Sequence, residues 1–217
     1  PKPGRYESKY WNFTIPEPVP SDGGGFHIKP YQKPHPPIGV AGVSGNSETL
    51  KMAGERGWIP MSINLAPTTL LNTHWHAVEE GAHRSGRLPD RLTWRIAREV
   101  YVADSTSKAR SEALEGVLRR DFEQYFGRLL PRINYMDICK VDPNMPDSDV
   151  TAEYLIDNVW IVGSPEEVTF QLKKLYQEVG GFGVLLAMGH EWQPKDQWTH
   201  SMTLLAEEVI PSLSKTL

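Results

Sequence analysis

The sequence contains very little cysteine and no long apolar segment. Cys139 is the only cysteine among 217 residues, so no disulfide forms within the chain, and this usage fits the reducing cytoplasm. No run of about 18 apolar residues is present, which excludes a membrane-spanning helix. The formal net charge of −4 gives no electrostatic reason to expect nucleic acid or an anionic membrane as a partner. We therefore expect a cytoplasmic protein with neither of these partners.

The N-terminal segment, residues 1–37, is rich in proline and contains three consecutive glycines at 23–25. These residues exclude a long helix or a central strand, whereas the aromatic residues among them favour an extended, partly packed loop. The chain opens on Pro1, and its first residues read as the middle of a loop. We therefore expect the native N-terminus to lie upstream, and no secretory signal is visible.

From Ile38 onward, segments typical of strands alternate with segments typical of helices. The predicted strands are residues 38–43, 58–65, 93–103 and 182–188, and the first has the uninterrupted apolar pattern of a strand covered on both faces. The predicted helices are residues 48–56, about 17 residues after Ala66-Pro67, 104–126, 165–179 and 197–208. The alternation predicts a parallel sheet with right-handed crossovers, either half of an eight-unit barrel or a small doubly wound sheet.

Two helix boundaries in this pattern are marked by individual residues. Gly57 is expected to end the first helix, and Ser164 is expected to cap the helix that follows it, with Glu167 completing a capping box. Residues 127–158, which contain three prolines and several aspartates, are predicted to be an irregular insertion with short helical pieces. We expect 1–217 to form a single domain.

The most informative motif is AGVSGNSET at residues 41–49, where a strand runs into small polar residues and then a helix. Free N–H groups and the positive dipole end at a helix start suit a phosphate group. The hydroxyls of Ser44, Ser47 and Thr49 add donors, and Gly45 lets the backbone approach a ligand. The alternative is that Ser47 only caps the helix.

Several segments in order resemble the luciferase-like flavin monooxygenase family, most closely its limonene and alkanal monooxygenase types. They are PYQKPHPPI at 30–38 with AGVS at 41–44, ERGW at 55–58, REVYVAD at 98–104, VGSPEEV at 162–168, GFGVLL at 181–186 and EEVIP at 207–211. The resemblance implies an α/β fold of the (β/α)8 TIM-barrel type, of which this chain supplies about the last four β/α units, a half-barrel.

The resemblance also implies a chemistry. Family members use reduced FMN, supplied by a separate flavin reductase, and O2 to oxygenate a small organic substrate. Their loop after the fifth strand contacts the flavin phosphate, so the cofactor-binding candidates here are Ser44, Gly45, Asn46, Ser47 and Thr49. The catalytic residues stay unknown, because the family's first four strands, with much of the flavin pocket, have no counterpart in this chain.

Other polar residues follow the predicted strands. His190 and Trp192 come after the last strand, at the rim where barrel enzymes bind substrate, and are substrate-binding candidates; the alternative is a loop whose aromatic ring packs on the last helix. Asn64 lies near the end of the second strand, within reach of the same rim. No metal site is expected at His74 and His76, for which a substrate-side or simply exposed position is favoured. Arg95 and Arg98, next to Glu99, are expected to form an internal ion pair, with a flavin or substrate contact as the alternative.

Two further functions remain open for this sequence. One is an F420-dependent oxidoreductase of the same superfamily, whose cofactor would use the same phosphate site. The other is a non-catalytic half-barrel that acts as a binding or scaffolding protein. In either case an open parallel sheet exposes edges and an apolar face, so we expect a homo-oligomer or association with the missing N-terminal half.

Overall fold

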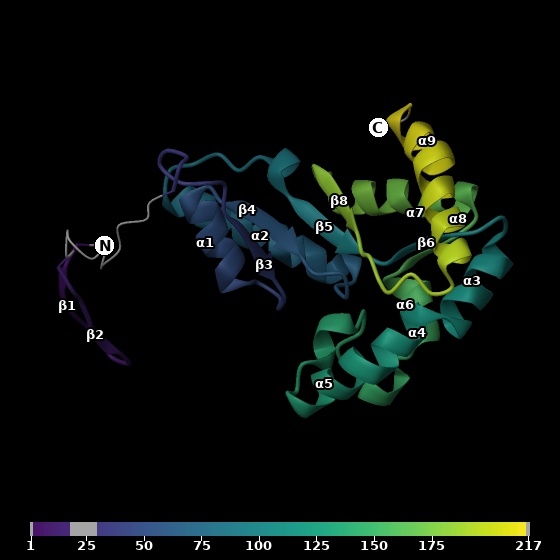
Figure 1. Cartoon of the computed structure of the whole chain (residues 1–217), viewed down its shortest axis with the longest axis horizontal. Helices are drawn as coiled ribbons and strands as arrows, with labels where there is room; N and C mark the ends of the chain where they lie inside the picture. The colour runs from purple at the N-terminus through teal and green to yellow at the C-terminus, as the bar shows by residue number, and fades with distance from the viewer. Residues whose placement is uncertain (1, 18–29, 216–217) are drawn as a thin grey trace. The chain divides into compact units, whose positions relative to one another are not determined.

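The computed structural model describes residues 2–17 and 30–215, which fall into two units, Pro1–Pro37 and Ile38–Leu217 (Figure 1). The boundary lies where the proline-rich segment of the sequence ends. The three glycines at 23–25 lie outside the described residues. None of the helices among the described residues has the length and apolar character needed to cross a membrane.

The first unit contains a β-hairpin where the sequence analysis expected an extended loop. Strand β1 (Gly4–Glu7) pairs antiparallel with β2 (Asn12–Ile15). Tyr6 lies opposite Phe13 in this register, and their rings stack with centroids 5.3 Å apart. Aromatic residues facing each other across two strands stabilise such a pairing. The high proline content of the segment had favoured a loop instead. Residues 4–15 therefore form a hairpin in place of the extended, partly packed loop that was expected.

The second unit is built on a four-stranded parallel sheet. Its strands are β3 (Gly39–Gly42), β4 (Ile59–Ser62), β5 (Arg95–Arg98) and β8 (Val184–Ala187), hydrogen-bonded in the order β3-β4-β5-β8. All three pairings are parallel. The prediction of four neighbouring strands that run in the same direction is confirmed.

Helices α1 (Glu48–Arg56) and α2 (Thr68–Arg84) follow β3 and β4 and have the predicted lengths. Gly57 ends α1 with a left-handed φ of 70°, which glycine adopts without strain. The two helices cross in close contact at Gly81, where an added Cβ atom would lie 1.8 Å from the Lys51 carbonyl oxygen. No larger residue fits at this crossing without moving a helix.

The third predicted strand is interrupted at one residue, Glu99. Before it, β5 pairs with β8, and the Met188 N–H donates to the Arg98 carbonyl at 2.9 Å. After it, β6 (Val100–Val102) pairs with β7 (Ile161–Gly163), and the Ile161 N–H donates to the Glu99 carbonyl at 2.9 Å. The chain thus changes partner strands at Glu99. Strand β7 was not predicted, because three residues carry too little pattern.

The long helix predicted for residues 104–126 is divided. Ser105 caps α3 (Thr106–Glu115) as expected, but Gly116 is extended, with φ −103° and ψ −156°, and separates α3 from α4 (Val117–Asp121). A π-helical turn, η2 (Phe122–Phe126), and α5 (Gly127–Arg132) continue from there. The predicted irregular insertion contains α5 and the short elements η3 (Met136–Cys139), η4 (Asp147–Asp149) and α6 (Ala152–Asn158).

The last helices follow the prediction at their starts and depart from it at their ends. Ser164 caps α7 (Pro165–Glu178) by accepting from the Glu167 N–H, but its own N–H donates to Thr106, so the capping box is only half formed. The predicted helix 197–208 is longer at both ends. It consists of α8 (Lys195–Leu204), the π-helical turn η5 (Leu205–Val209) and α9 (Ile210–Ser214).

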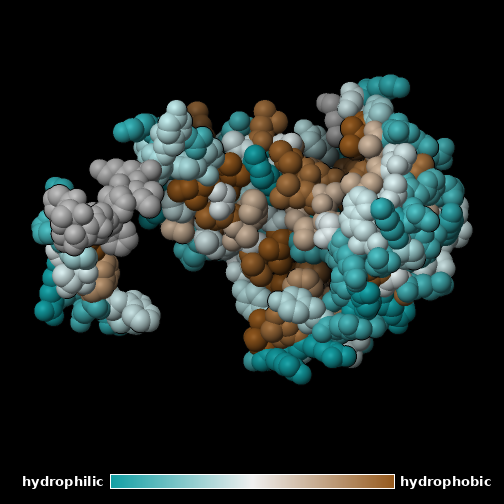
Figure 2. Space-filling model, viewed as in Figure 1, coloured by the Kyte–Doolittle hydropathy of each residue, from teal (hydrophilic) through white to brown (hydrophobic). Residues whose placement is uncertain are grey.

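One face of the sheet is covered by helices, whereas the other is partly open. A Cβ atom on Gly42 would lie 2.3 Å from Leu50 of α1, so this side of β3 faces the helix layer. Ala41, which points the opposite way, is exposed, and its register partner Met61 is only half-buried, as is Leu186 in β8. Apolar residues gather around these strands in Figure 2. The expectation that β3 is covered on both faces was therefore wrong for the described residues.

Candidate functional site

Polar side chains follow the carboxyl ends of all four parallel strands. Ser44 comes after β3, Asn64 after β4, Glu99 after β5 and His190 after β8. Because the strands run in the same direction, these four positions lie along one edge of the sheet, where α/β proteins bind their ligands. This edge is the candidate functional site.

The loop after β3 ends in a capped helix with unused donors. The Ser47 hydroxyl accepts from the Leu50 N–H at 3.4 Å and lies 3.2 Å from the Thr49 hydroxyl, so Ser47 does cap α1. Among the described residues, the backbone N–H groups of Ser47, Glu48 and Thr49 have no hydrogen-bond acceptor. Capping and anion binding are therefore compatible here, because the cap uses only an N–H one turn further along.

A buried histidine on α2 supports this loop from below. His74 is fully buried, and its Nε2 lies 3.1 Å from the Ser44 carbonyl oxygen, while its Nδ1 lies 2.9 Å from the Ser62 hydroxyl. Trp94 Nε1 donates to the same hydroxyl at 2.9 Å. Burial, aided by the charge of Arg98, lowers the pKa of His74 to about 4. The imidazole is therefore neutral at neutral pH.

These contacts fix the position of the imidazole proton. The Ser44 carbonyl can only accept, so the single proton of the neutral ring is on Nε2 and donates to it. Nδ1 is then unprotonated and accepts from the Ser62 hydroxyl, whose oxygen accepts from the Trp94 indole. Three hydrogen bonds thus run in one direction from Trp94 to the loop.

Thr73 of α2 also contacts this loop, at Asn46. The Asn46 N–H donates to the Thr73 hydroxyl at 3.2 Å, and this hydroxyl donates to the Leu70 carbonyl at 2.8 Å. Asn46 has a φ of 49°, in the left-handed region that asparagine tolerates. Its N–H group is occupied by Thr73, so only its exposed side chain is available to a ligand.

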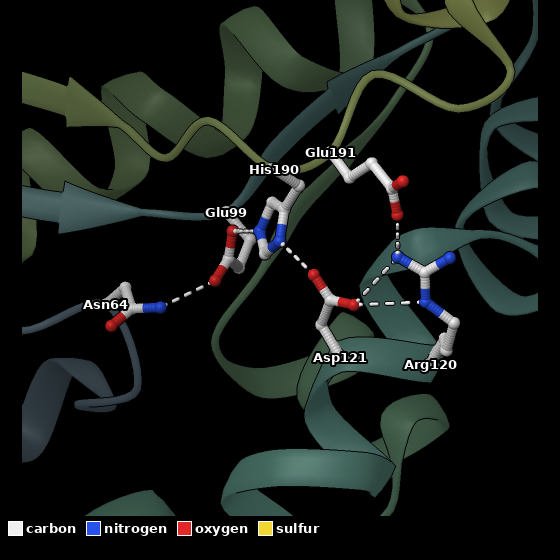
Figure 3. Close-up of polar contacts among 6 residues, drawn as sticks. All are labelled: Asn64, Glu99, Arg120, Asp121, His190 and Glu191. Atoms are coloured by element: carbon white, nitrogen blue, oxygen red, sulfur yellow. Dashed lines mark hydrogen bonds and ion pairs between the residues drawn. The ribbon is translucent and has the colours of Figure 1, made fainter.

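The second cluster of the site is an acid–imidazole network (Figure 3). His190 Nε2 lies 2.6 Å from a Glu99 carboxylate oxygen, and Nδ1 lies 2.9 Å from an Asp121 carboxylate oxygen. The Asn64 amide donates to the other Glu99 oxygen at 2.5 Å. Glu99, with help from Asp121, raises the pKa of His190 to about 9 against the opposing effect of burial. His190 is therefore an imidazolium that donates from both nitrogens.

A neighbouring ion pair ties the same loop to the same helix. Arg120 of α4 contacts Glu191 at 2.7 Å and Asp121 at 3.1 Å. Together with His190, this pair fastens the segment after β8 to α4. Trp192 in this segment is exposed, with 44% of its surface accessible. The structure thus brings His190 into a polar network and leaves Trp192 at the surface of the described chain.

The ion pair expected for the arginines of β5 is not formed. Arg98 is buried and donates to the carbonyls of Ala66 at 2.7 Å and Ala97 at 3.0 Å, and burial lowers its pKa to about 10. Glu99 binds His190 and Asn64, because successive residues in a strand point to opposite faces. Arg95 donates to the Thr93 carbonyl at the surface.

His74 and His76 both lie on α2, where residues two positions apart point away from each other. His74 is buried, whereas His76 is exposed beside Glu79. In the portion of the chain that the structure describes, no group of three or more His, Cys, Asp or Glu side chains is arranged to hold a metal ion.

Comparison with known proteins places this geometry in a family. The luciferase-like monooxygenase family matches residues 5–181 by sequence. The chain belongs to the luciferase-like monooxygenase family. It is 32% identical over 218 residues to 3,6-diketocamphane 1,6-monooxygenase of Pseudomonas putida, covering 98% of this chain and 57% of that protein. It is 28% identical to limonene 1,2-monooxygenase of Rhodococcus erythropolis, covering 88% of this chain and 47% of that protein.

A solved structure of this luciferase-like family agrees with the fold. It is the oxygenating constituent of 3,6-diketocamphane monooxygenase from Pseudomonas putida, a type II Baeyer–Villiger monooxygenase in complex with FMN. The TM-score is 0.78 at 32% identity, covering 98% of this chain and 58% of that one. The chain thus spans about half the length of the relatives it matches, and its α/β fold is that of luciferase-like barrel proteins.

The residues after β3 fit the phosphate end of a flavin. An FMN phosphate carries negative charge and accepts hydrogen bonds, and the loop offers hydroxyls of Ser44, Ser47 and Thr49 beside unused N–H groups at the positive end of α1. Glu48, the carboxylate in the first turn of α1, is paired with Lys51 at 2.9 Å, so its repulsion toward an anion is reduced. The donor set is therefore that of an anion site.

Two positions of the candidate site were not predicted from the sequence. His74 was expected on the substrate side or exposed, whereas it is fully buried and hydrogen-bonded in a helix that packs on the sheet. Asp121 carried no signal, because it lies 69 residues from His190 in the chain and reaches it only through the fold.

Proposed function

We propose that the protein is a two-component flavin-dependent monooxygenase, which takes reduced FMN from a separate flavin reductase and oxygenates a small organic substrate with O2. The observation that carries this proposal is the anion-type donor set after β3. It occurs in a chain that is similar, over 98% of its length, to a monooxygenase whose structure holds FMN. When bound, reduced FMN supplies the electrons by which one oxygen atom of O2 enters the substrate and the other leaves as water.

The residues after β3 hold the cofactor in this proposal. The hydroxyls of Ser44, Ser47 and Thr49 and the N–H groups at the start of α1 bind the phosphate, and Gly45 contributes through its backbone. The Asn46 side chain is the remaining candidate, since its N–H group already donates to Thr73. Anchoring the phosphate fixes one end of the flavin and thereby orients its ring system within the site.

The segment after β8 acts on the substrate side. Both ring nitrogens of His190 donate to carboxylates, so His190 holds the segment in place while Trp192 lines the substrate pocket. Asn64 and Glu99 complete the polar edge between the two ends of the site.

The chain supplies the last four β/α units of a (β/α)8 barrel. Three observations support this proposal. Among the described residues, strands β3 and β8 each have a single neighbour in the sheet, one sheet face is apolar and partly open, and the relatives are nearly twice as long. The other four units, or a second copy of the chain, would cover this face.

The proposal is tested by titrating the full-length protein that carries this chain with FMN, reduced FMN and F420 in parallel. Oxygenation is then assayed with an added flavin reductase, NADH and O2, and 3,6-diketocamphane is the first substrate because a similar relative is named for it. We expect binding of FMN and reductase-dependent oxygen consumption. Absence of binding to either form of FMN overturns the proposal, and turnover with F420 alone assigns the alternative chemistry.

A further inference from the structure

The contact between His74 and Ser44 determines which groups the loop presents to a ligand. In a trans peptide the C=O and the following N–H point in opposite directions. The Ser44 carbonyl points to His74 on α2, so the Gly45 N–H on the same peptide points away from α2. This N–H has no acceptor within the described residues. It is therefore a further unused backbone donor, in addition to those of Ser47, Glu48 and Thr49.

The support below the loop is built for this orientation. Three residues of α2 contact it: Leu70 lies 3.3 Å from the position of a Cβ on Gly45, Thr73 accepts from the Asn46 N–H, and His74 donates to the Ser44 carbonyl. Leu70 also packs against the apolar core, and His74 is hydrogen-bonded to Ser62 of β4, which accepts from Trp94. These hydrogen bonds thus fix the position of the loop relative to the sheet.

We propose that His74 is the positioning residue of the flavin phosphate site: its Nε2–H holds the Ser44 carbonyl inward and so keeps the donors of residues 44–49 turned toward the phosphate. His74 does not touch the cofactor. The inference rests on the proposed function, because it assigns a role within the same site. A neutral imidazole is suited to this role, since its one free proton meets one carbonyl and no uncompensated charge is buried.

The test compares FMN with riboflavin, which differ only in the phosphate. In the full-length protein, His74→Leu removes the donor, whereas His74→Gln keeps an N–H near the same place. Val78→Ala, a buried change in the same helix that does not contact the loop, is the matched control. Dissociation constants for both oxidised flavins are measured by fluorescence quenching, and thermal unfolding is recorded for each variant.

We expect His74→Leu to weaken FMN binding about tenfold, because one hydrogen bond that positions the loop is lost. Riboflavin binding should change less than about twofold. His74→Gln should recover most of the FMN affinity, and Val78→Ala should leave the FMN-to-riboflavin ratio unchanged. Equal weakening of both flavins by His74→Leu would show a merely structural role and overturn the inference. Unchanged FMN binding would overturn it as well.

A second measurement does not depend on the folding of a variant. In the wild-type protein labelled with ¹⁵N-histidine, His74 should show a protonated Nε2 and an unprotonated Nδ1 from pH 5.5 to 8. A ring protonated on Nδ1 alone in this range lacks the proposed Nε2–H donor and overturns the inference. A wild-type protein that prefers neither flavin, or binds none, instead overturns the proposed function and with it the inference.

Discussion

His190 carries its positive charge between two carboxylates that come from different parts of the chain. Glu99 and Asp121 bind its two ring nitrogens and raise its pKa from about 6.5 to about 9. The protonated ring is thus bound more tightly in the folded than in the unfolded chain. Its contribution to the free energy of unfolding is complete below pH 6.5 and is lost as the pH rises through about 9.

Replacing this residue should therefore cost stability in a pH-dependent way. We expect His190→Gln to lower the free energy of unfolding by about 2 kcal/mol at pH 6 and by much less at pH 10. Urea denaturation between pH 6 and pH 10 measures this change in the free energy of unfolding. Glu191→Gln, which removes the exposed pair with Arg120 and leaves the imidazole contacts intact, should lower stability equally at both ends. If His190→Gln lowers the free energy of unfolding by the same amount at pH 6 and pH 10, the raised pKa assigned to His190 is contradicted.

Cys139 gives a second test at the scale of one residue. The thiol is fully buried in the core of the insertion, and burial raises its pKa to about 12. Thiols react as thiolates, so we expect no alkylation by iodoacetamide at pH 8 while the protein is folded. Mass spectrometry should detect one adduct only after unfolding in guanidinium. Rapid labelling of the native protein would contradict the packing of the insertion.

Helices α1 and α2 set the position of the loop after β3, and the spacing of the two helices depends on Gly81. A methyl group there meets the Lys51 carbonyl, so Gly81→Ala should separate the helices and lower the free energy of unfolding by about 1–3 kcal/mol in spite of the better helix propensity of alanine. Differential scanning calorimetry measures the change. Gly189→Ala, where an added Cβ meets nothing within 4 Å, is the control and should leave the melting temperature unchanged.

The elements were predictable where their signals are local. Gly57 and Ser164 mark helix ends by their own chemistry, and the four strands of the main sheet have short apolar runs between helices. The division of α3 from α4 at Gly116 was missed, since a single glycine inside a helical pattern is often tolerated. The site was only half predictable: its loop at 41–49 is continuous, whereas Glu99 and His190 are 91 residues apart.

At the scale of the whole molecule, the open sheet face links the fold to the proposed barrel. Ala41, Met61 and Leu186 lie on that face and are exposed or half-buried in the described structure. Apolar surface of this kind, next to unpaired strand edges, is normally covered in a stable protein. The chain alone is therefore expected to associate with itself when the rest of the barrel is absent.

Residues 1–217 expressed alone should form dimers or larger species at micromolar concentration, measured by light scattering and sedimentation velocity. A charge on the open face opposes this burial, so Met61→Lys should shift the equilibrium toward monomer. Met202→Lys, at an exposed position of α8, is the control and should leave association unchanged. Co-expression with a four-unit N-terminal segment should replace self-association by a one-to-one complex. A stable monomer with native-like thermal unfolding would show that the sheet face needs no partner, and the half-barrel proposal would then fail.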